Sequence, residues 1–185
     1  MNMARYLIDK SASRFTVRAF ASGMLSALGH NPTIAIRDFS GEASFVPKAP
    51  SEDSLRLEIR AGSLEVTNDI SGRDRREIER TMNQEVLEVE KYPSISYQSS
   101  SVSASPVADN MYRASIAGTL HLHGVAQREP IQAQITVSGD TLRASGEFSL
   151  SQSDYGIKLV SVAGGTLKLK DELKFSFEIV AREQG

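Results

Sequence analysis

Hydrophobic and polar residues alternate along most of this chain. In the segment SLRLEIR, residues 54–60, Leu55, Leu57 and Ile59 alternate with polar residues. A period of two places the hydrophobic side chains of a β-strand on one face, so the segment predicts a strand. The same pattern predicts strands at 13–21, 94–100, 111–123, 130–139, 141–150 and 172–180, and a weaker form of it predicts strands at 5–9, 33–38 and 41–45.

The predicted strands have one apolar face each, which is typical of an antiparallel sheet with one face on a core and the other in water. The turn-forming sequences GHNP, SGD and GG separate several of them. A sheet with so many strands removes its exposed edges by closing on itself. We therefore predict an all-β protein built as a closed antiparallel barrel.

Two segments break the alternation. Residues 22–29, SGMLSALG, predict a short helix or a turn. Residues 70–93 predict one helix or two short ones, with Ser71 or Asp69 as the N-terminal cap and Pro93 at the end.

The helical segment at 70–93 has one apolar stripe. Ile78 and Met82 are four residues apart, so they would share a face and point at the protein. The charged residues between Arg73 and Arg80 would mostly face water, which favours a solvated helix face over a docking site for a partner protein. The serine-rich residues 99–106 are expected to form a loop running out of a strand.

Composition limits the classes to which the chain could belong. Its 185 residues suit a single domain over 1–185, and the formal net charge of −2 offers no basic excess for nucleic acid. Cysteine is absent, which excludes disulfides and thiol chemistry. No apolar run approaches the roughly 18 residues that cross a bilayer, and the N-terminus shows no secretory signal. We expect a cytoplasmic protein without stable membrane insertion; a chain that had lost a signal would look the same and would be periplasmic.

The sequence GTLHLHG at 118–124 holds two of the three histidines. His121 and His123 have the parity of the polar residues, so we expect both on the solvent face. Side chains two residues apart on a strand lie about 7 Å apart on one face, and with a third ligand they could hold a metal ion. With His30 they define the alternative function, a metal-dependent enzyme or metal-binding protein, whereas a solvated pair is the simpler interpretation.

The face predicted to point inward carries small residues among large ones. Ala114, Gly118, Ala133, Ala144 and Gly146 all have interior parity. An eight-stranded barrel is either filled by its own side chains or holds one small ligand. Alternation of large and small residues is also ordinary in a packed core, so both interpretations stay open. A cavity would favour a long alkyl or isoprenoid chain, because burial is worth about 0.8 kcal/mol per CH₂.

Five motifs, taken in order and spacing, resemble one known family. KYPSISYQSS at 91–100 resembles its YP-x-I-x-F-x-S signature, and GTLHLHGVAQREPI at 118–131 resembles its G-x-L-T-L-x-G-V-T-x-P-V hairpin. SQSDYGIK at 151–158 resembles its R-x-D-F-G-I segment. Residues 73–93 resemble its helix before Tyr-Pro, and residues 25–45 an early segment of one branch. The chain thus resembles the YceI-like, polyisoprenoid-binding family.

This resemblance covers about Tyr6 to Ala181. It implies an extended, lipocalin-like eight-stranded antiparallel barrel with a short helical segment around residues 71–90. It also implies an elongated apolar pocket for a long-chain isoprenoid quinone or a similar amphiphile, with no catalytic residue, no metal and no cofactor besides the bound lipid. Gln152 stands where many members have Arg.

We therefore expect non-enzymatic binding, transport or sequestration of a polyisoprenoid, an isoprenoid quinone, or a fatty amide or acid. The partner would be this lipid and no nucleic acid, and a homodimer is left open. His30, which could equally be a turn residue before Asn-Pro, would meet the head group with Asn31 or Tyr155. The residues expected at the ligand are Val17, His30, Leu57, Ile59, Tyr97, Ile116, Gly118, Leu120, Ala133, Ile135, Leu142, Phe148, Tyr155, Phe175 and Phe177.

Overall fold

The structure is a computed structural model that describes residues 4–22, 31–47, 53–162 and 167–185. Strands make up most of it, with one α-helix and a few short helical turns. The strands are β1 Arg5–Ile8, β2 Arg14–Ser22, β3 Thr33–Ile36, β4 Phe39–Ser44, β5 Ser54–Arg60, β6 Leu64–Val66, β7 Ser94–Ala108, β8 Met111–Leu122, β9 Val125–Arg128, β10 Ile131–Ser138, β11 Thr141–Ser151, β12 Ser161–Val162 and β13 Leu167–Gln184. The helical elements are α1 Gly72–Thr81 and the short turns η2 Ala61–Ser63, η3 Met82–Val86 and η4 Gln152–Tyr155.

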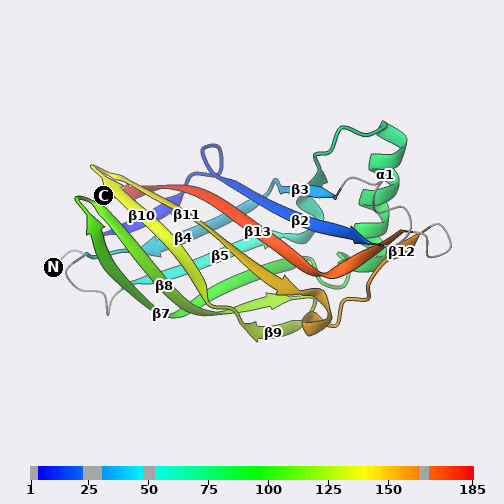
Figure 1. Cartoon of the computed structure of the whole chain (residues 1–185). Coiled ribbons are helices and arrows are strands. Elements are labelled where there is room, and N and C mark those ends of the chain that lie inside the picture. The colour runs from blue at the N-terminus through cyan, green and yellow to red at the C-terminus, as the bar shows by residue number, and fades with distance from the viewer. Residues whose placement is uncertain (1–3, 23–30, 48–52, 163–166) are drawn as a thin grey trace.

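The strands form a closed antiparallel barrel. Eight of them follow one another in the order β1-β4-β5-β7-β8-β10-β11-β13, and pairing of β1 with β13 closes the ring. Helix α1 lies at one end of this barrel, and the C-terminus lies at the other (Figure 1). The prediction of an eight-stranded antiparallel barrel with one short helix is confirmed.

The long strand β13 gives the barrel two different ends. Its last residues pair with β1, whereas Lys168–Glu178 pair with β2. Strands β3 and β6 continue the sheet beyond β2, so β6 is its edge near α1. Such an edge has unpaired backbone groups. Helix α1 covers it: Oε1 of Glu79 accepts a hydrogen bond from the backbone N–H of Val66 at 2.9 Å, and Arg75 donates to the carbonyl of Asn68 at 2.9 Å.

The serine-rich segment at 99–106 is strand, so its prediction as a loop is wrong. Residues of β7 pair with β8 almost to the end of the hairpin, with irregularities at Ser99/Ser101 and Pro106/Ala108. Val102 and Ala104 pack against the core, and the alternating residues Ser101, Ser103 and Ser105 face water. Most residues of this segment are small, so the alternation of inward and outward positions was not recognised in the sequence. The short strands β6 and β9 also escaped prediction.

Helix α1 begins where the capping signal predicts. The Ser71 side chain accepts a hydrogen bond from the backbone N–H of Asp74 at 3.0 Å. The helix ends in one turn of π-helix, η3, where Met82 is buried as expected. Ile78 also faces the protein, because it lines the end of the cavity, where it stays 38% exposed. Most of the other predicted helical segment, residues 23–29, lies outside the described residues.

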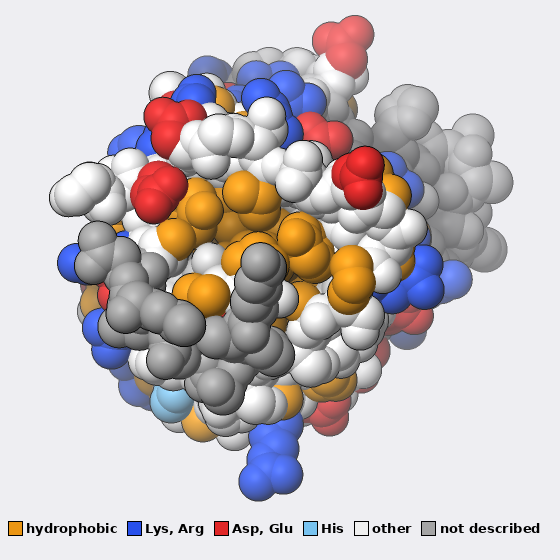
Figure 2. All heavy atoms as spheres, turned by 90° about the vertical axis from the view of Figure 1, so that its left-hand side faces the viewer, with side chains coloured by type: hydrophobic (Ala, Val, Ile, Leu, Met, Phe, Trp, Pro, Cys, Tyr) orange, Lys and Arg blue, Asp and Glu red, His pale blue; other side chains and the backbone are white. Residues whose placement is uncertain are grey.

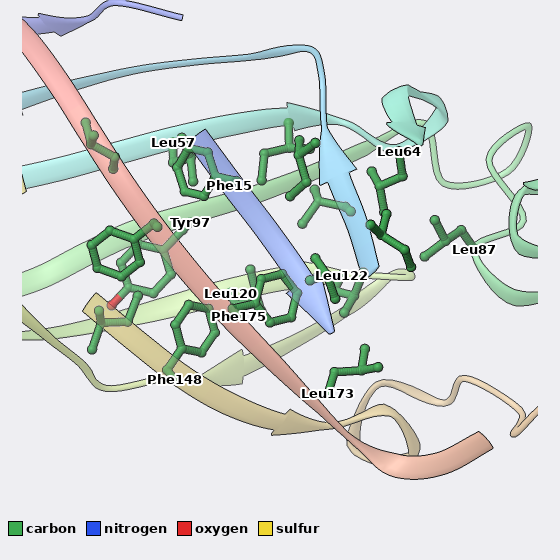
Figure 3. A pocket seen from close by; sticks show the side chains of 18 of the residues that line it. Phe15, Leu57, Leu64, Leu87, Tyr97, Leu120, Leu122, Phe148, Leu173 and Phe175 are labelled. Atoms are coloured by element: carbon green, nitrogen blue, oxygen red, sulfur yellow. The ribbon is translucent and has the colours of Figure 1, made fainter. Parts of the chain in front are cut away.

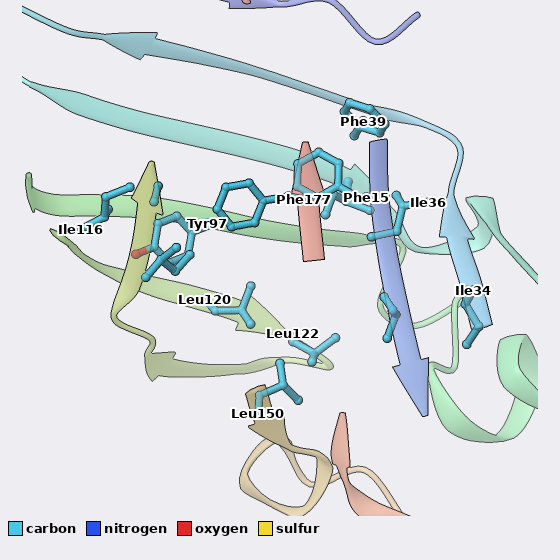
Figure 4. Close-up of a cluster of buried hydrophobic side chains, with 14 of the residues drawn as sticks. Phe15, Ile34, Ile36, Phe39, Tyr97, Ile116, Leu120, Leu122, Leu150 and Phe177 are labelled. Atoms are coloured by element: carbon cyan, nitrogen blue, oxygen red, sulfur yellow. The ribbon is translucent and has the colours of Figure 1, made fainter. Parts of the chain in front are cut away.

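Aromatic rings project from the strands into the interior of the barrel (Figure 4). The rings of Phe15 and Phe39 meet edge to face at 4.8 Å between centroids, and Phe148 stacks on Phe175 at 5.0 Å. Backbones without a side chain make room for two further rings: a Cβ at Gly146 would lie 2.7 Å from Cζ of Phe177, and one at Gly118 would clash with Tyr97. The wall of the barrel is therefore tightly packed between neighbouring strands.

Candidate ligand-binding cavity

An apolar cavity of about 530 Å³ runs inside this wall. It lies within the range of roughly 300–1,000 Å³ that is usual for sites of small molecules and cofactors. The inward faces of successive strands line it, and Figure 3 shows side chains from β2, β5, β7, β8, β11 and β13 converging on it. Of the residues expected at a ligand, the cavity is lined by Val17, Leu57, Ile59, Tyr97, Ile116, Leu120, Ala133, Ile135, Leu142, Phe148, Phe175 and Phe177.

Strand parity explains why these residues meet. On β8, Ile116, Leu120 and Leu122 are buried, whereas Ala117 and His121 between them are exposed. Strands β10 and β7 carry the same alternation, so their hydrophobic side chains reach the same interior. The interior is a cavity and not a core filled from wall to wall, which decides between the two interpretations that the sequence leaves open.

Gly118 does not line the cavity, because Tyr97 takes the space beside it. A Cβ at Gly118 would collide with the Tyr97 ring and its hydroxyl, and would lie 2.7 Å from the carbonyl oxygen of Gln98. The Tyr97 hydroxyl donates a hydrogen bond to the carbonyl of Glu129 at 2.9 Å. Burial, aided by the Glu129 carboxylate, raises the pKa of Tyr97 to about 12. The missing side chain admits a protein ring at this position.

Tyr155 also lies away from the cavity lining. It is fully buried, and its hydroxyl donates to Oε1 of Glu129 at 2.7 Å. Burial first, and then the hydrogen bond to Glu129, raise the pKa of Tyr155 above its ordinary value. Tyr155 thus ties η4 to the segment between β9 and β10. His30, another candidate for a head group, lies outside the described residues.

The two histidines of GTLHLHG have different environments. His121 is exposed on β8, as predicted, but the prediction is wrong for His123, whose side chain is only 10% exposed. Strand β8 ends at Leu122, and His123 and Gly124 form a two-residue turn with φ of 52° and 74°. Positive φ at both residues is the hairpin geometry that follows the twist of the strands. The dipeptide His-Gly, with glycine at the second turn position, was the available signal for this turn.

The turn directs the His123 ring into a cluster of other residues. Its Nε2 lies 2.6 Å from Oε2 of Glu88, and its Nδ1 lies 3.2 Å from the carbonyl oxygen of Tyr155. The Tyr92 ring packs beside it at 4.5 Å between centroids. These contacts join the segment after α1, the β8–β9 hairpin and η4. Within the described ranges, no three His, Asp or Glu side chains come together as a metal site would require.

The end of the cavity at α1 is bordered by residues that the sequence did not identify as site residues. Asp74, Glu77, Ile78 and Thr81 of the helix line it. Gln152 also lines the cavity with a side chain that is almost fully buried, and its amide donates to the carbonyl of Lys170 at 3.0 Å. The sequence did not predict that α1 borders the cavity, because the charged residues of a helix usually indicate only a solvated face.

The cavity reaches the opposite end of the barrel as well. Ser44, Phe45, Ser54 and Val102 line it there. Figure 2 looks at the end away from α1 and shows hydrophobic side chains in a hollow between polar ones.

Among the described residues, no helix is long and apolar enough to span a membrane.

Comparisons with known proteins place the chain in a family. The family model described as YceI-like domain matches residues 6–181. A UPF0312 protein of Pseudomonas aeruginosa (strain LESB58) is 29% identical over 163 residues, which cover 84% of this chain and 78% of that protein. Protein YceI of Salmonella arizonae is 28% identical over 138 residues, covering 74% and 64% of the two chains.

Solved structures with low sequence identity share the fold. BcnA of Burkholderia cenocepacia superposes with a TM-score of 0.71 at 16% identity, covering 94% of this chain and 98% of that one. A polyisoprenoid binding domain from Saccharophagus degradans superposes with a TM-score of 0.70 at 14% identity, covering 99% and 100%. Because the family model spans nearly the whole sequence, the chain belongs to the YceI-like family.

Proposed function

We propose that this protein binds a long-chain apolar amphiphile, a polyisoprenoid or an isoprenoid quinone, and carries or sequesters it without chemical change. The observation that carries the proposal is the cavity of about 530 Å³, whose lining is Leu, Ile, Val, Phe and Ala over most of its length. Burial of each CH₂ group is worth about 0.8 kcal/mol. A chain of many such groups therefore binds tightly through area alone, with no catalytic group, metal or cofactor.

The shape of the cavity favours a long ligand over a compact one. Its lining residues on β13 extend from Leu169 to Ile179. Ten residue steps at about 3.3 Å each give roughly 33 Å along the strand. A strand tilt of about 40° reduces this to about 25 Å along the barrel axis. An extended alkyl or isoprenoid chain matches such a space, whereas a small globular metabolite leaves most of it empty.

The comparisons support the same ligand class. The Saccharophagus degradans domain, which shares the fold, is described as polyisoprenoid binding. The head group of a single-headed amphiphile would then lie at one end of the cavity and the tail along its axis. Residues such as Leu120, Phe148 and Phe175 would contact the tail.

Lipid extraction and a matched pair of variants test this function. Protein purified without detergent should release a long-chain lipid that mass spectrometry identifies, and delipidated protein should bind a fluorescent isoprenoid. Ala133→Phe adds a ring from the inward face of β10, whereas Gln134→Phe adds the same ring to its exposed face. We expect Ala133→Phe to weaken binding at least tenfold and Gln134→Phe to leave it unchanged. A protein that yields no lipid and binds no isoprenoid would refute the proposal.

A further inference from the structure

We propose that residues 72–92 form a strap that closes one side of the cavity and opens to let a ligand pass, with the contact between Glu88 and His123 as its latch. The strap consists of α1, η3 and the residues that follow up to Tyr92. This inference rests on the proposed function, because it names the route by which a ligand reaches the same site.

The wall of the barrel beside β6 is not made of strand. Strand β6 is the last in the order of the sheet, so its outer edge pairs with no further strand among the described residues. Strand β7 does not extend into this space, because it begins at Ser94, opposite Arg60 at the end of β5. The next strands around the barrel are those of the β8–β9 hairpin. Another part of the chain therefore has to close the wall between β6 and this hairpin.

The strap lies in this position and contacts both neighbours. On one side, Oε1 of Glu79 accepts a hydrogen bond from the backbone N–H of Val66 in β6 at 2.9 Å. On the other side, Oε2 of Glu88 lies 2.6 Å from Nε2 of His123 in the hairpin turn. The Tyr92 ring packs against the His123 ring at 4.5 Å between centroids. The strap thus takes the place that a strand would have in a fully regular barrel.

The inner side of the strap covers the cavity. Figure 3 shows the Leu87 side chain at this end of the cavity. The hydrophobic strap residues in the lining are Ile78, Met82, Val86 and Leu87. Outward movement of the strap would withdraw these side chains and open the cavity sideways, along the length of a bound chain.

Side chains, and not a backbone ladder, join the strap to the barrel. Its own backbone hydrogen bonds are internal: the N–H of Val89 donates to the carbonyl of Asn83 at 2.9 Å, and the N–H of Tyr92 donates to that of Glu88 at 2.9 Å. Within the part of the chain that the structure describes, no backbone–backbone hydrogen bond links residues 72–92 to a strand. Few side-chain contacts have to break for the strap to open as one unit while the barrel stays folded.

The closed strap also buries polar groups that have no partner. Across the described ranges, Nε of Arg75 and Oδ1 of Asn83 are buried without a hydrogen bond. A buried polar atom without a partner costs free energy that contact with water recovers. The closed position therefore carries a cost that opening would remove.

The latch is built on a strained residue. Glu88 has a φ of 46°, in the left-handed region that residues with a side chain rarely adopt. The other described residues besides glycine with positive φ, Asn110 and His123, belong to hairpin turns, whereas Glu88 does not. Strain of this kind persists where surrounding contacts enforce it, and it is frequent in clamps and switches. The contact with His123 enforces it here, so loss of that contact favours release of the strap.

A reversible change of the latch tests the inference. The chain has no cysteine, so Glu88→Cys with His123→Cys gives a protein that a short bismaleimide links only at this site. Stopped-flow fluorescence measures the rates at which delipidated full-length protein binds and releases a fluorescent isoprenoid. Without the linker, we expect release about tenfold faster than in the wild type, because a charged hydrogen bond is lost. With the linker, binding and release should both be about tenfold slower than in the wild type, because the strap stays closed.

Matched variants separate the latch from general effects. Arg56→Cys with Gln98→Cys places the same linker between the outward faces of the paired strands β5 and β7, and it should keep the wild-type rates. Glu88→Ala should release the probe about fivefold faster, whereas Glu90→Ala, with the same change in net charge at an exposed strap position, should not. Circular dichroism confirms that each variant is folded.

Hydrogen exchange tests the strap without any ligand. Amides of residues 72–92 should exchange together and faster than those of β8, and faster still in Glu88→Ala. Protection equal to that of β8 in both proteins would overturn the inference.

Two kinetic results would also overturn it: wild-type rates in the linked protein, which would mean that the ligand passes elsewhere, or wild-type release in Glu88→Ala. Absence of probe binding by the wild type is a different result. It would refute the proposed function, and a route for the ligand would fall with it.

Discussion

The contact between Gly118 and Tyr97 makes the packing of the barrel wall testable. In Gly118→Ala, the new methyl group would overlap the Tyr97 ring and lie 2.7 Å from the carbonyl oxygen of Gln98. The β7–β8 pairing holds that carbonyl in place, so the ring has to move. The cavity is the available space, and the move breaks the hydrogen bond from Tyr97 to Glu129. Overpacking costs about 1–3 kcal/mol and the lost hydrogen bond about 1 kcal/mol. We expect a loss of about 2–4 kcal/mol.

Urea denaturation followed by far-ultraviolet circular dichroism measures this loss, and the melting temperature should fall by roughly 2–4 °C for each kcal/mol. Gly62→Ala is the matched control, because no atom lies within 4 Å of its added Cβ. A double-mutant cycle with Tyr97→Leu isolates the contact. Without the ring, Gly118→Ala should cost less than about 1 kcal/mol. If it costs the same in both backgrounds, the reasoning from the Tyr97 contact is wrong.

Three further predictions follow from other contacts. Glu79→Ala removes the acceptor of the Val66 N–H and should cost about 1–3 kcal/mol, with faster hydrogen exchange in β6; unchanged exchange would contradict it. Burial raises the pKa of Tyr97 from 10.0 to about 12, so the unfolded chain loses this proton first and stability falls between about pH 10 and 12. In Tyr97→Phe, the urea midpoint should fall less steeply than in the wild type between about pH 10 and 12. An equal fall in both proteins would contradict the role of Tyr97. His123→Ala loses its contacts with Glu88 and Tyr155 and should cost about 1–2 kcal/mol by urea denaturation, whereas wild-type stability would show that the contacts add nothing.

Strand positions and facing were predictable because alternation encodes both. The segment 54–60 forms β5 with the predicted bounds, and the inward set of β8 and β10 lines the interior. The direction of a side chain on a strand depends only on parity. The sequence therefore specified which residues meet, although it left open whether they leave a cavity, since that depends on volumes summed over many strands.

Features that depend on tertiary contacts were not predictable in this way. His123 left the face that parity assigns because the strand ended one residue earlier. Tyr155 has the polar group that a head group needs, but Glu129 occupies it. Residues 99–106 are strand because β8 pairs with them, although their serines resemble a loop. Ile78 and Thr81 of α1 line the end of the cavity in a helix that Glu79 and Arg75 bond to the edge of the sheet and the segment after it, a contact that the sequence pattern does not encode.

Dense packing in the wall and empty space along the axis have one physical cause. Neighbouring strands bring Gly118 against Tyr97 and Gly146 against Phe177 so closely that a methyl group does not fit. The hydrogen bonds of the ladder hold neighbouring strands about 4.8 Å apart, so side chains of adjacent strands pack against one another. Eight strands then hold the opposite walls apart, and Ala133 and Ala144 do not reach across. Side chains at the axis lack partners on one side and lose those dispersion contacts. Under the proposed function an apolar chain would supply the missing atoms, so the same wall that makes the barrel stable would also make its interior a binding site.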